Sequence, residues 1–116
     1  MMQDIEKICK SAQTVIETEA TTISALTSRI NADFAHACQY LLECKGKIIV
    51  MGMGKSGHIG KKIAATFAST GSPAFFIHPG EAKHGDFGMI TQNDVLLIIS
   101  NSGETDEILA ILPFIK

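Results

Sequence analysis

A glycine-rich turn joins an apolar run to an amphipathic run near the middle of this chain. Residues 47–51 (KIIVM) are apolar after the first position and predict a buried strand, and residues 57–70 carry apolar side chains at helical spacing. The turn between them includes Gly52-Met53-Gly54-Lys55-Ser56-Gly57. In α/β proteins, a turn at the carboxyl end of a strand and the start of a helix commonly holds an anion. The turn therefore predicts an α/β domain and poses the question of which anion it holds.

The N-terminal part of the chain is helical by its apolar spacing. Apolar residues recur three or four positions apart through residues 1–45. Asn31 and Asp33 are suitable caps for a second helix over about 31–44, which would split the run in two. We expect the apolar stripe to pack in a core or against a second copy of the chain rather than to form a binding groove.

Strand and helix patterns alternate through the rest of the chain. Strands are predicted at 74–78 and at 95–100. Gly71 is expected to end the 57–70 helix in a left-handed conformation, and a third helix is predicted from Glu104 onward. Apolar strands that alternate with helices indicate a parallel sheet, and hence the α/β class.

The length of the chain predicts an unfinished domain. Three strands make a narrow sheet, and Pro113 would kink or end the last helix shortly before residue 116. We therefore expect a fragment of a larger protein, with residues 1–45 as a helical segment and residues 46–116 as the first half of a sandwich.

Composition excludes several classes of function. The formal net charge is -2, and the aromatic residues are one tyrosine and six phenylalanines, which disfavours nucleic-acid binding. The sequence has no long apolar window for a membrane span and no apolar stretch typical of a signal peptide. Its three cysteines form no CxxC pair, which is typical of thiols in a reducing compartment. A cytoplasmic protein is expected.

Two common nucleotide motifs fit the glycine turn poorly. A dinucleotide fold needs an acidic residue at the end of the second strand, where this chain has His78, and Glu81 lies beyond the turn. A phosphate loop of NTPases would need glycine at position 49, which is Ile49. A smaller anion remains, with Lys55 and Ser56 as candidate contacts. Lys55 is equally compatible with a solvated surface position.

A second polar loop is predicted after the third strand. It reads Ser100-Asn101-Ser102-Gly103-Glu104-Thr105 and leads into the last predicted helix. Free backbone N–H groups at a helix start, with hydroxyls beside them, suit one phosphomonoester. The same residues also fit plain helix capping, with Ser102 as the cap and Glu104 in the first turn.

The histidines divide into two groups. His36 lies in the N-terminal helical run, whereas His58, His78 and His84 lie in or beside the predicted loops. Imidazoles there could transfer a proton or serve a structural role. No HxH or HExxH spacing indicates a dedicated zinc site.

Three motifs together resemble a known family. The segments GMGKSGHIG, FFIHPGEAKHGD and SNSGE closely resemble the sugar isomerase (SIS) domain of bacterial D-arabinose 5-phosphate isomerases over about residues 46–112. The resemblance implies a flavodoxin-like α/β/α sandwich and a homotetramer that usually carries a C-terminal pair of CBS domains, and we expect this pair to be absent from the 116 residues. It also implies interconversion of D-ribulose 5-phosphate and D-arabinose 5-phosphate, which begins Kdo synthesis for lipopolysaccharide, without a required cofactor.

The same resemblance implies roles for individual residues. Lys55 and Glu107 match a catalytically relevant lysine and glutamate, and His84 matches a histidine of the substrate site with a catalytic role. His78 matches a substrate-site histidine that can take an inhibitory zinc. The implied substrate contacts are Ser56, Gly71, Ser72, His78, His84, Ser100, Asn101, Ser102, Glu104 and Thr105.

Other functions remain open at this point. The family's remaining catalytic glutamate and histidine lie beyond this chain, so we expect the 116 residues alone to be inactive. The alternative is a non-catalytic module that binds a sugar phosphate. SIS domains in transcription regulators usually accompany a helix-turn-helix domain, and no such pattern is present here. A paralogue in sugar-alcohol metabolism would carry the same motifs.

Overall fold

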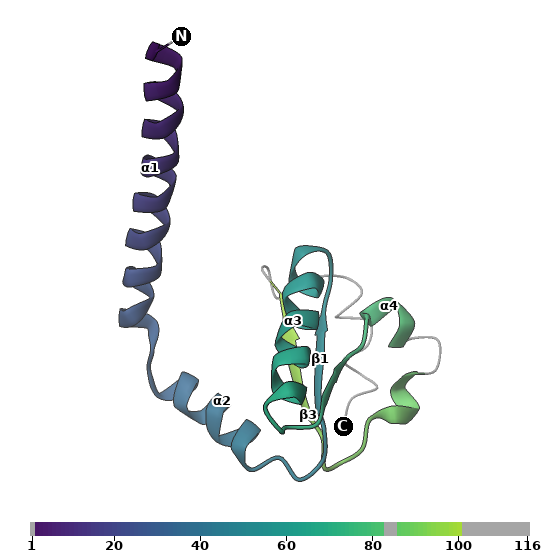
Figure 1. Cartoon of the computed structure of the whole chain (residues 1–116). Coiled ribbons are helices and arrows are strands. Elements are labelled where there is room, and N and C mark those ends of the chain that lie inside the picture. Colours follow the sequence, from purple (N-terminus) through teal and green to yellow (C-terminus); the bar gives the residue numbers. More distant parts are fainter. Residues whose placement is uncertain (1, 83–85, 101–116) are drawn as a thin grey trace. The chain divides into compact units, whose positions relative to one another are not determined.

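The chain forms two compact units, which are described separately. The computed structural model describes residues 2–82 and 86–100 of the 116 residues. The units are Met1–Cys38 and Gln39–Lys116. Figure 1 shows the course of the chain through both of them.

The first unit is helical, as predicted. It contains α1 (Met2–Ala25), the 3-10 helix η1 (Leu26–Arg29) and most of α2 (Ala32–Leu42). Asn31 caps α2, because its Oδ1 accepts hydrogen bonds from the backbone N–H groups of Asp33 at 3.0 Å and Phe34 at 3.3 Å. The predicted split of the helical run at Asn31 is therefore confirmed.

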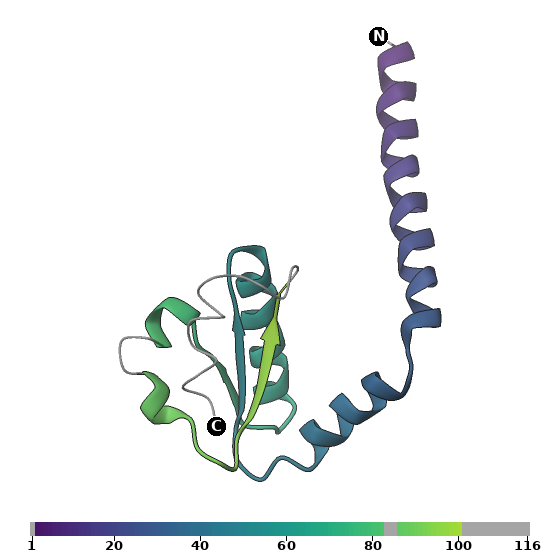
Figure 2. The same ribbon diagram turned by 180° about the vertical axis from the view of Figure 1, so that it is seen from behind.

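The second unit contains a parallel sheet. Its strands are β1 (Ile48–Gly52), β2 (Ala74–Phe76) and β3 (Val95–Ile99), in the order β2-β1-β3. Both neighbours pair with β1 in parallel, which confirms the predicted α/β sheet. Figure 2 shows β1 and β3 running in the same direction. All three strands therefore end at one edge of the sheet, which we call the carboxyl edge.

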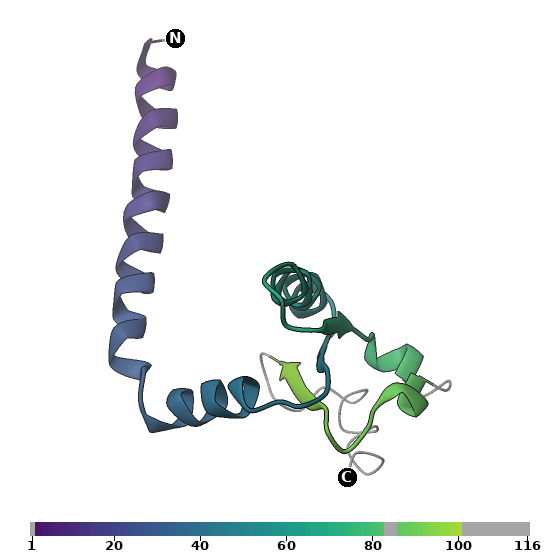
Figure 3. The same ribbon diagram turned by 60° about the horizontal axis from the view of Figure 1, so that its bottom comes forward.

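Apolar side chains of the central strand are buried on both faces of the sheet. Every residue of β1 is buried. Ile48 and Val50 pack with Ala64 of α3 (Lys55–Ser69) on one face, whereas Ile49 and Met51 pack with Ile77 on the other. The segment with α4 (Pro79–Ala82) and η2 (Asp86–Met89) lies across the sheet from α3 (Figure 3). This double burial explains why β1 reads as a continuous apolar run.

Two element boundaries differ from the prediction. Helix α3 begins at Lys55 rather than near residue 57, so Lys55 is a helical residue and not the tip of a loop. Strand β2 ends at Phe76 rather than at residue 78. Pro79 has no backbone N–H to continue a ladder, and His78 instead precedes the first turn of α4. The third helix, predicted from Glu104, lies outside the described residues.

Asp94 holds the starts of β1 and β3 together. Its Oδ1 accepts the backbone N–H of Lys47 at 2.7 Å, and its Oδ2 accepts that of Thr91, also at 2.7 Å. The Lys47 ammonium lies 3.5 Å from Oδ2, and the Asp94 side chain is 1% exposed. These bonds set the register that brings Gly52 opposite Ile99 at the carboxyl edge.

Acid is expected to destabilise the second unit through Asp94. Burial alone raises the pKa of this carboxyl group, but hydrogen bonds from Lys47 and Thr91 and the Lys47 charge outweigh it and lower the pKa below 3.8. The stabilisation is complete above that ordinary value and is lost as the pH falls through the lowered pKa. Urea unfolding between about pH 6 and about pH 3 measures the loss, which should be smaller in Asp94→Asn. The exposed control Glu43→Gln should behave as the unmodified chain; an equal acid response in Asp94→Asn would contradict the assignment.

No helix within the described ranges is both long and apolar enough to cross a membrane.

Candidate functional site at the carboxyl edge

Four of the predicted site residues follow strand ends at the carboxyl edge. Lys55 and Ser56 come after β1, His78 comes after β2, and Ser100 comes after β3. The parallel pairing of the strands brings the three connections to one edge of the sheet. This edge is where open α/β sheets bind ligands.

In the glycine turn, the backbone at the start of α3 lies very close to the backbone at the end of β1. A Cβ atom on Gly52 would lie 2.7 Å from the Ser56 carbonyl oxygen, and one on Gly57 would lie 2.8 Å from the Gly52 carbonyl oxygen. Gly54 has φ of 57°, which side chains rarely allow, and it precedes the first helical residue. The glycines of the motif therefore serve close backbone packing and a sharp turn, independently of any ligand.

The first turn of α3 faces the candidate site with donors and a cation. Gly54 supplies no side-chain cap, and the first N–H groups bonded back into the turn are those of Gly57 and His58. Lys55 is exposed, Ser56 is half-buried, and within residues 2–82 and 86–100 Lys55 makes no ion pair. A helix start with uncapped N–H groups and a lysine is a favourable place for negative charge.

His78 caps the short helix α4 with its imidazole ring. Its Nδ1 accepts a hydrogen bond from the backbone N–H of Gly80 at 3.0 Å, and its carbonyl oxygen accepts one from Glu81 at 2.9 Å. Pro79, between them, is fully buried. The hydrogen bond between Gly80 and His78 was not predicted from the sequence, although a side chain that can accept a bond two residues before a backbone N–H at a helix start is a recognisable capping pattern.

The described residues do not fit a zinc ion at His78. No group of three or more potential metal ligands occurs in the described part of the chain. The Nδ1 atom of His78 is already engaged with Gly80. The described residues therefore offer no set of ligands for the zinc that the resemblance implies.

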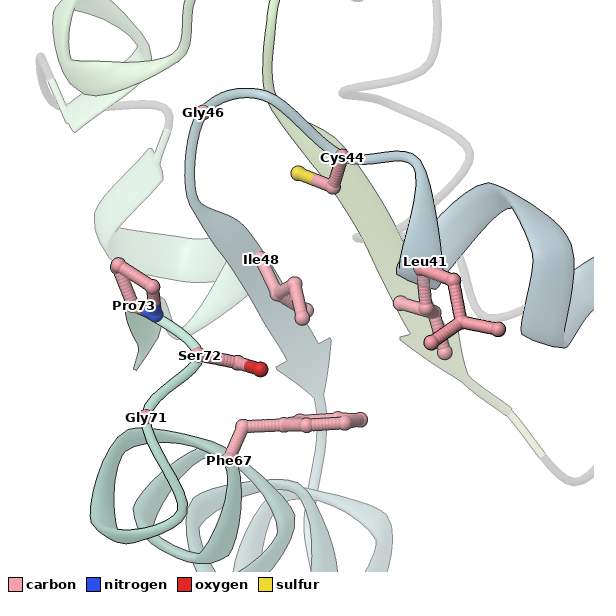
Figure 4. Close-up of a pocket in the computed structure, with 9 residues that line it drawn as sticks. Leu41, Cys44, Gly46, Ile48, Phe67, Gly71, Ser72 and Pro73 are labelled. Carbon is pink, nitrogen blue, oxygen red and sulfur yellow. The ribbon is translucent and has the colours of Figure 1, made fainter.

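Gly71 and Ser72 lie at the opposite edge of the sheet. Gly71 has φ of 98° and ends α3, which confirms its predicted role as a left-handed stop. Because β2 begins just after this pair, the pair lies at the amino edge, away from Lys55 in the same chain. It borders a pocket of about 270 Å³ (Figure 4). The other residues that line this pocket are Leu41, Leu42, Cys44, Gly46, Ile48, Phe67 and Pro73.

Six of the predicted site residues fall within 83–85 and 101–116, outside the described residues. They are His84, Asn101, Ser102, Glu104, Thr105 and Glu107. Within the described residues, the carboxyl edge thus contains Lys55, Ser56, His78 and Ser100 of the predicted site.

The parallel sheet and its glycine turn belong to a known class of α/β domain. Residues 41–116 match the SIS domain, and the chain belongs to this family. The particular relatives are enzymes named arabinose 5-phosphate isomerase KdsD. The Yersinia pestis enzyme is 58% identical over 107 residues, which cover 92% of this chain and 33% of the relative. The Pseudomonas aeruginosa enzyme is 57% identical over 116 residues, which cover 100% of this chain and 35% of the relative.

A solved structure gives the same result for the fold. An Escherichia coli CFT073 protein in complex with arabinose 5-phosphate matches with a TM-score of 0.86 and 44% identity. The match covers 93% of this chain and 57% of the E. coli chain. The chain spans about a third of the length of the curated relatives it matches.

Proposed function

We propose that this chain is part of an isomerase that interconverts D-ribulose 5-phosphate and D-arabinose 5-phosphate. The observation that carries the proposal is the 57% identity across all 116 residues to the Pseudomonas aeruginosa arabinose 5-phosphate isomerase. Such an enzyme works in the cytoplasm, and its product supplies Kdo for lipopolysaccharide. No redox cofactor is needed, because the isomerisation moves one proton between C1 and C2 and one between their oxygens, with no net oxidation or reduction of the sugar.

The described edge supplies two parts of this chemistry. Isomerisation passes through an enediolate, and a cation stabilises the charge that develops on its oxygen. Lys55, exposed and without an ion pair in the described segments, is the group we assign to that oxygen. The uncapped start of α3 adds a favourable field for the same charge. A carboxylate or imidazole must move the proton, and the phosphate is held remotely to position the reacting carbons.

A chimera tests the proposal directly. Residues 1–116 replace the matching segment of the Pseudomonas aeruginosa relative, and conversion of D-arabinose 5-phosphate to the ketose is measured. We expect turnover by the chimera and none by the 116-residue chain alone. A folded chimera that binds the sugar phosphate without turnover would instead indicate the non-catalytic module, and one that does not bind it would refute both functions.

We further propose that the protein is a homo-oligomer, a tetramer in its complete form. Helix α1 has no buried residue and exposes an apolar stripe that includes Ile5, Ile8, Ile16 and Ile23, each at least 61% exposed. An exposed apolar stripe along a helix is a candidate contact surface for a second copy of the chain.

The expected result is that the chain associates at micromolar concentration and that Ile8→Glu with Ile16→Glu shifts it toward monomers. A charge within the stripe would have to be buried without a partner on association. Sedimentation velocity or light scattering measures the change. Thr21→Glu, on the opposite side of the helix by its 3.6-residue repeat, is the matched control. A stable monomer of the unmodified chain would contradict the prediction.

A further inference from the structure

The proton on the His78 ring has a defined position in this fold. The Gly80 backbone nitrogen carries a hydrogen and can only donate, and it lies 3.0 Å from Nδ1 of His78. Nδ1 must therefore present its lone pair. In a neutral imidazole one nitrogen accepts and the other carries the proton, so the proton of His78 lies on Nε2.

The backbone around this bond restrains it. Pro79, which separates the two residues, has a fixed φ and is fully buried. The Glu81 N–H closes the same turn onto the His78 carbonyl oxygen at 2.9 Å. The Gly80 N–H therefore cannot turn away from the ring without opening the first turn of α4.

The other ring nitrogen is available for a ligand. His78 is half-buried and follows Ile77, whose N–H donates to the carbonyl oxygen of Val50 in β1 at 2.9 Å. No described residue accepts a hydrogen bond from Nε2. The ring thus combines one satisfied acceptor with one donor that has no acceptor in the described segments, and it follows β2 at the same edge of the sheet at which Lys55 follows β1.

A substrate contact at His78 is what the family resemblance implies. We propose that the Gly80 N–H fixes the ring in this contact as a hydrogen-bond donor, with Nε2–H given to a hydroxyl or carbonyl oxygen of the sugar phosphate. The identity of this ligand rests on the proposed function. The Gly80 N–H is the positioning group that sets this role. The ring is not the base that moves the C1–C2 proton, because Nε2 is already protonated and Nδ1 is engaged.

The same bond disfavours a metal at His78. A metal on Nε2 needs the lone pair there and moves the proton to Nδ1, which would then point at the Gly80 N–H. The Nδ1–H of His78 and the N–H of Gly80 would then be two donors facing each other, with their nitrogens 3.0 Å apart and no acceptor between them. Zinc binding through this ring therefore requires the turn of α4 to open.

Nuclear magnetic resonance of the ¹⁵N-labelled full chain tests the tautomer without any assay of function. Long-range ¹H–¹⁵N correlations distinguish the two neutral tautomers, and His78→Gln identifies the signal by its loss. We expect a protonated Nε2 and an unprotonated Nδ1, unchanged by an equimolar amount of Zn²⁺. A protonated Nδ1, a fast average of both tautomers, or direct coordination of zinc by His78 would overturn the proposal.

A matched pair of substitutions then tests the donor role in the chimera. Asn at position 78 can still accept the Gly80 N–H but does not reach as far as Nε2, whereas Gln can place an N–H group near the Nε2 position. We expect His78→Asn to raise KM for D-arabinose 5-phosphate about 10-fold, and His78→Gln to recover part of that loss. Equal KM values for the two variants would refute the donor role. An inactive unmodified chimera would refute the proposed function and leave the tautomer result standing.

Discussion

Replacing Lys55 by alanine in the chimera is expected to lower kcat about 100-fold or more, with a smaller change in KM. Lys55 is the first residue of α3, is exposed, and makes no ion pair in the parts of the chain that the structure describes. Charge develops on the substrate oxygen only as the enediolate forms, so losing the cation removes stabilisation from the transition state rather than from the bound sugar. The magnitude is that of losing one oxyanion donor.

Steady-state kinetics separate this role from simple anchoring. Lys62→Ala, which removes an exposed lysine seven residues further along α3, is the matched control and is expected to leave kcat unchanged. Ser102 and Thr105 are expected to hold the phosphate, which does not change during the reaction. Removing either hydroxyl should therefore raise KM, by an amount that corresponds to about 1–3 kcal/mol of lost binding free energy. A Lys55→Ala chimera that keeps its kcat and loses only affinity would identify the lysine as a phosphate anchor.

Local signals predicted the parts of the fold that depend on a few neighbouring residues. Asn31 caps α2 because its side chain accepts hydrogen bonds from backbone N–H groups two and three residues further on. Gly71 ends α3 because a residue without Cβ adopts the required positive φ without strain. The parallel direction of the strands also followed from the sequence, since apolar strands that alternate with helices indicate a parallel sheet.

Long-range packing determined what the sequence did not predict. The start of α3 at Lys55 depends on contacts between the backbones of Gly52 and Gly57, which no periodicity reveals. The hydrogen bond from the Lys47 backbone N–H to the Asp94 carboxylate likewise joins two residues that lie 47 positions apart in the sequence.

The candidate site was predictable as an edge but not as a set of contacts. Motif and topology together place Lys55 and His78 beside strand ends. They do not show that His78 is engaged through Nδ1, or that the pair Gly71-Ser72 lies at the other edge of the sheet. Both findings require the path of the backbone through a turn, which the sequence alone leaves open.

Gly57→Ala is expected to destabilise the second unit even though alanine favours helices. Within α3, the substitution should gain about 1 kcal/mol in helix propensity. The added Cβ would lie 2.8 Å from the carbonyl oxygen of Gly52, and backbone at the end of a fully buried strand cannot move aside cheaply. Overpacking of this kind costs about 3 kcal/mol, so the clash exceeds the propensity gain and the net loss is about 2 kcal/mol.

The matched control lies almost one turn further along the same helix. At Gly60 the added Cβ would meet the Phe76 ring at 3.1 Å and the Val50 side chain at 3.2 Å, and side chains can shift by the few tenths of an ångström required. Gly60→Ala should therefore be close to neutral, because its propensity gain offsets a mild contact. Urea unfolding of the two variants measures the difference. If Gly57→Ala were as stable as Gly60→Ala, the close approach of α3 to β1 would not be what positions Lys55 at the carboxyl edge. In that case the glycines of the motif would have to be explained by the ligand instead.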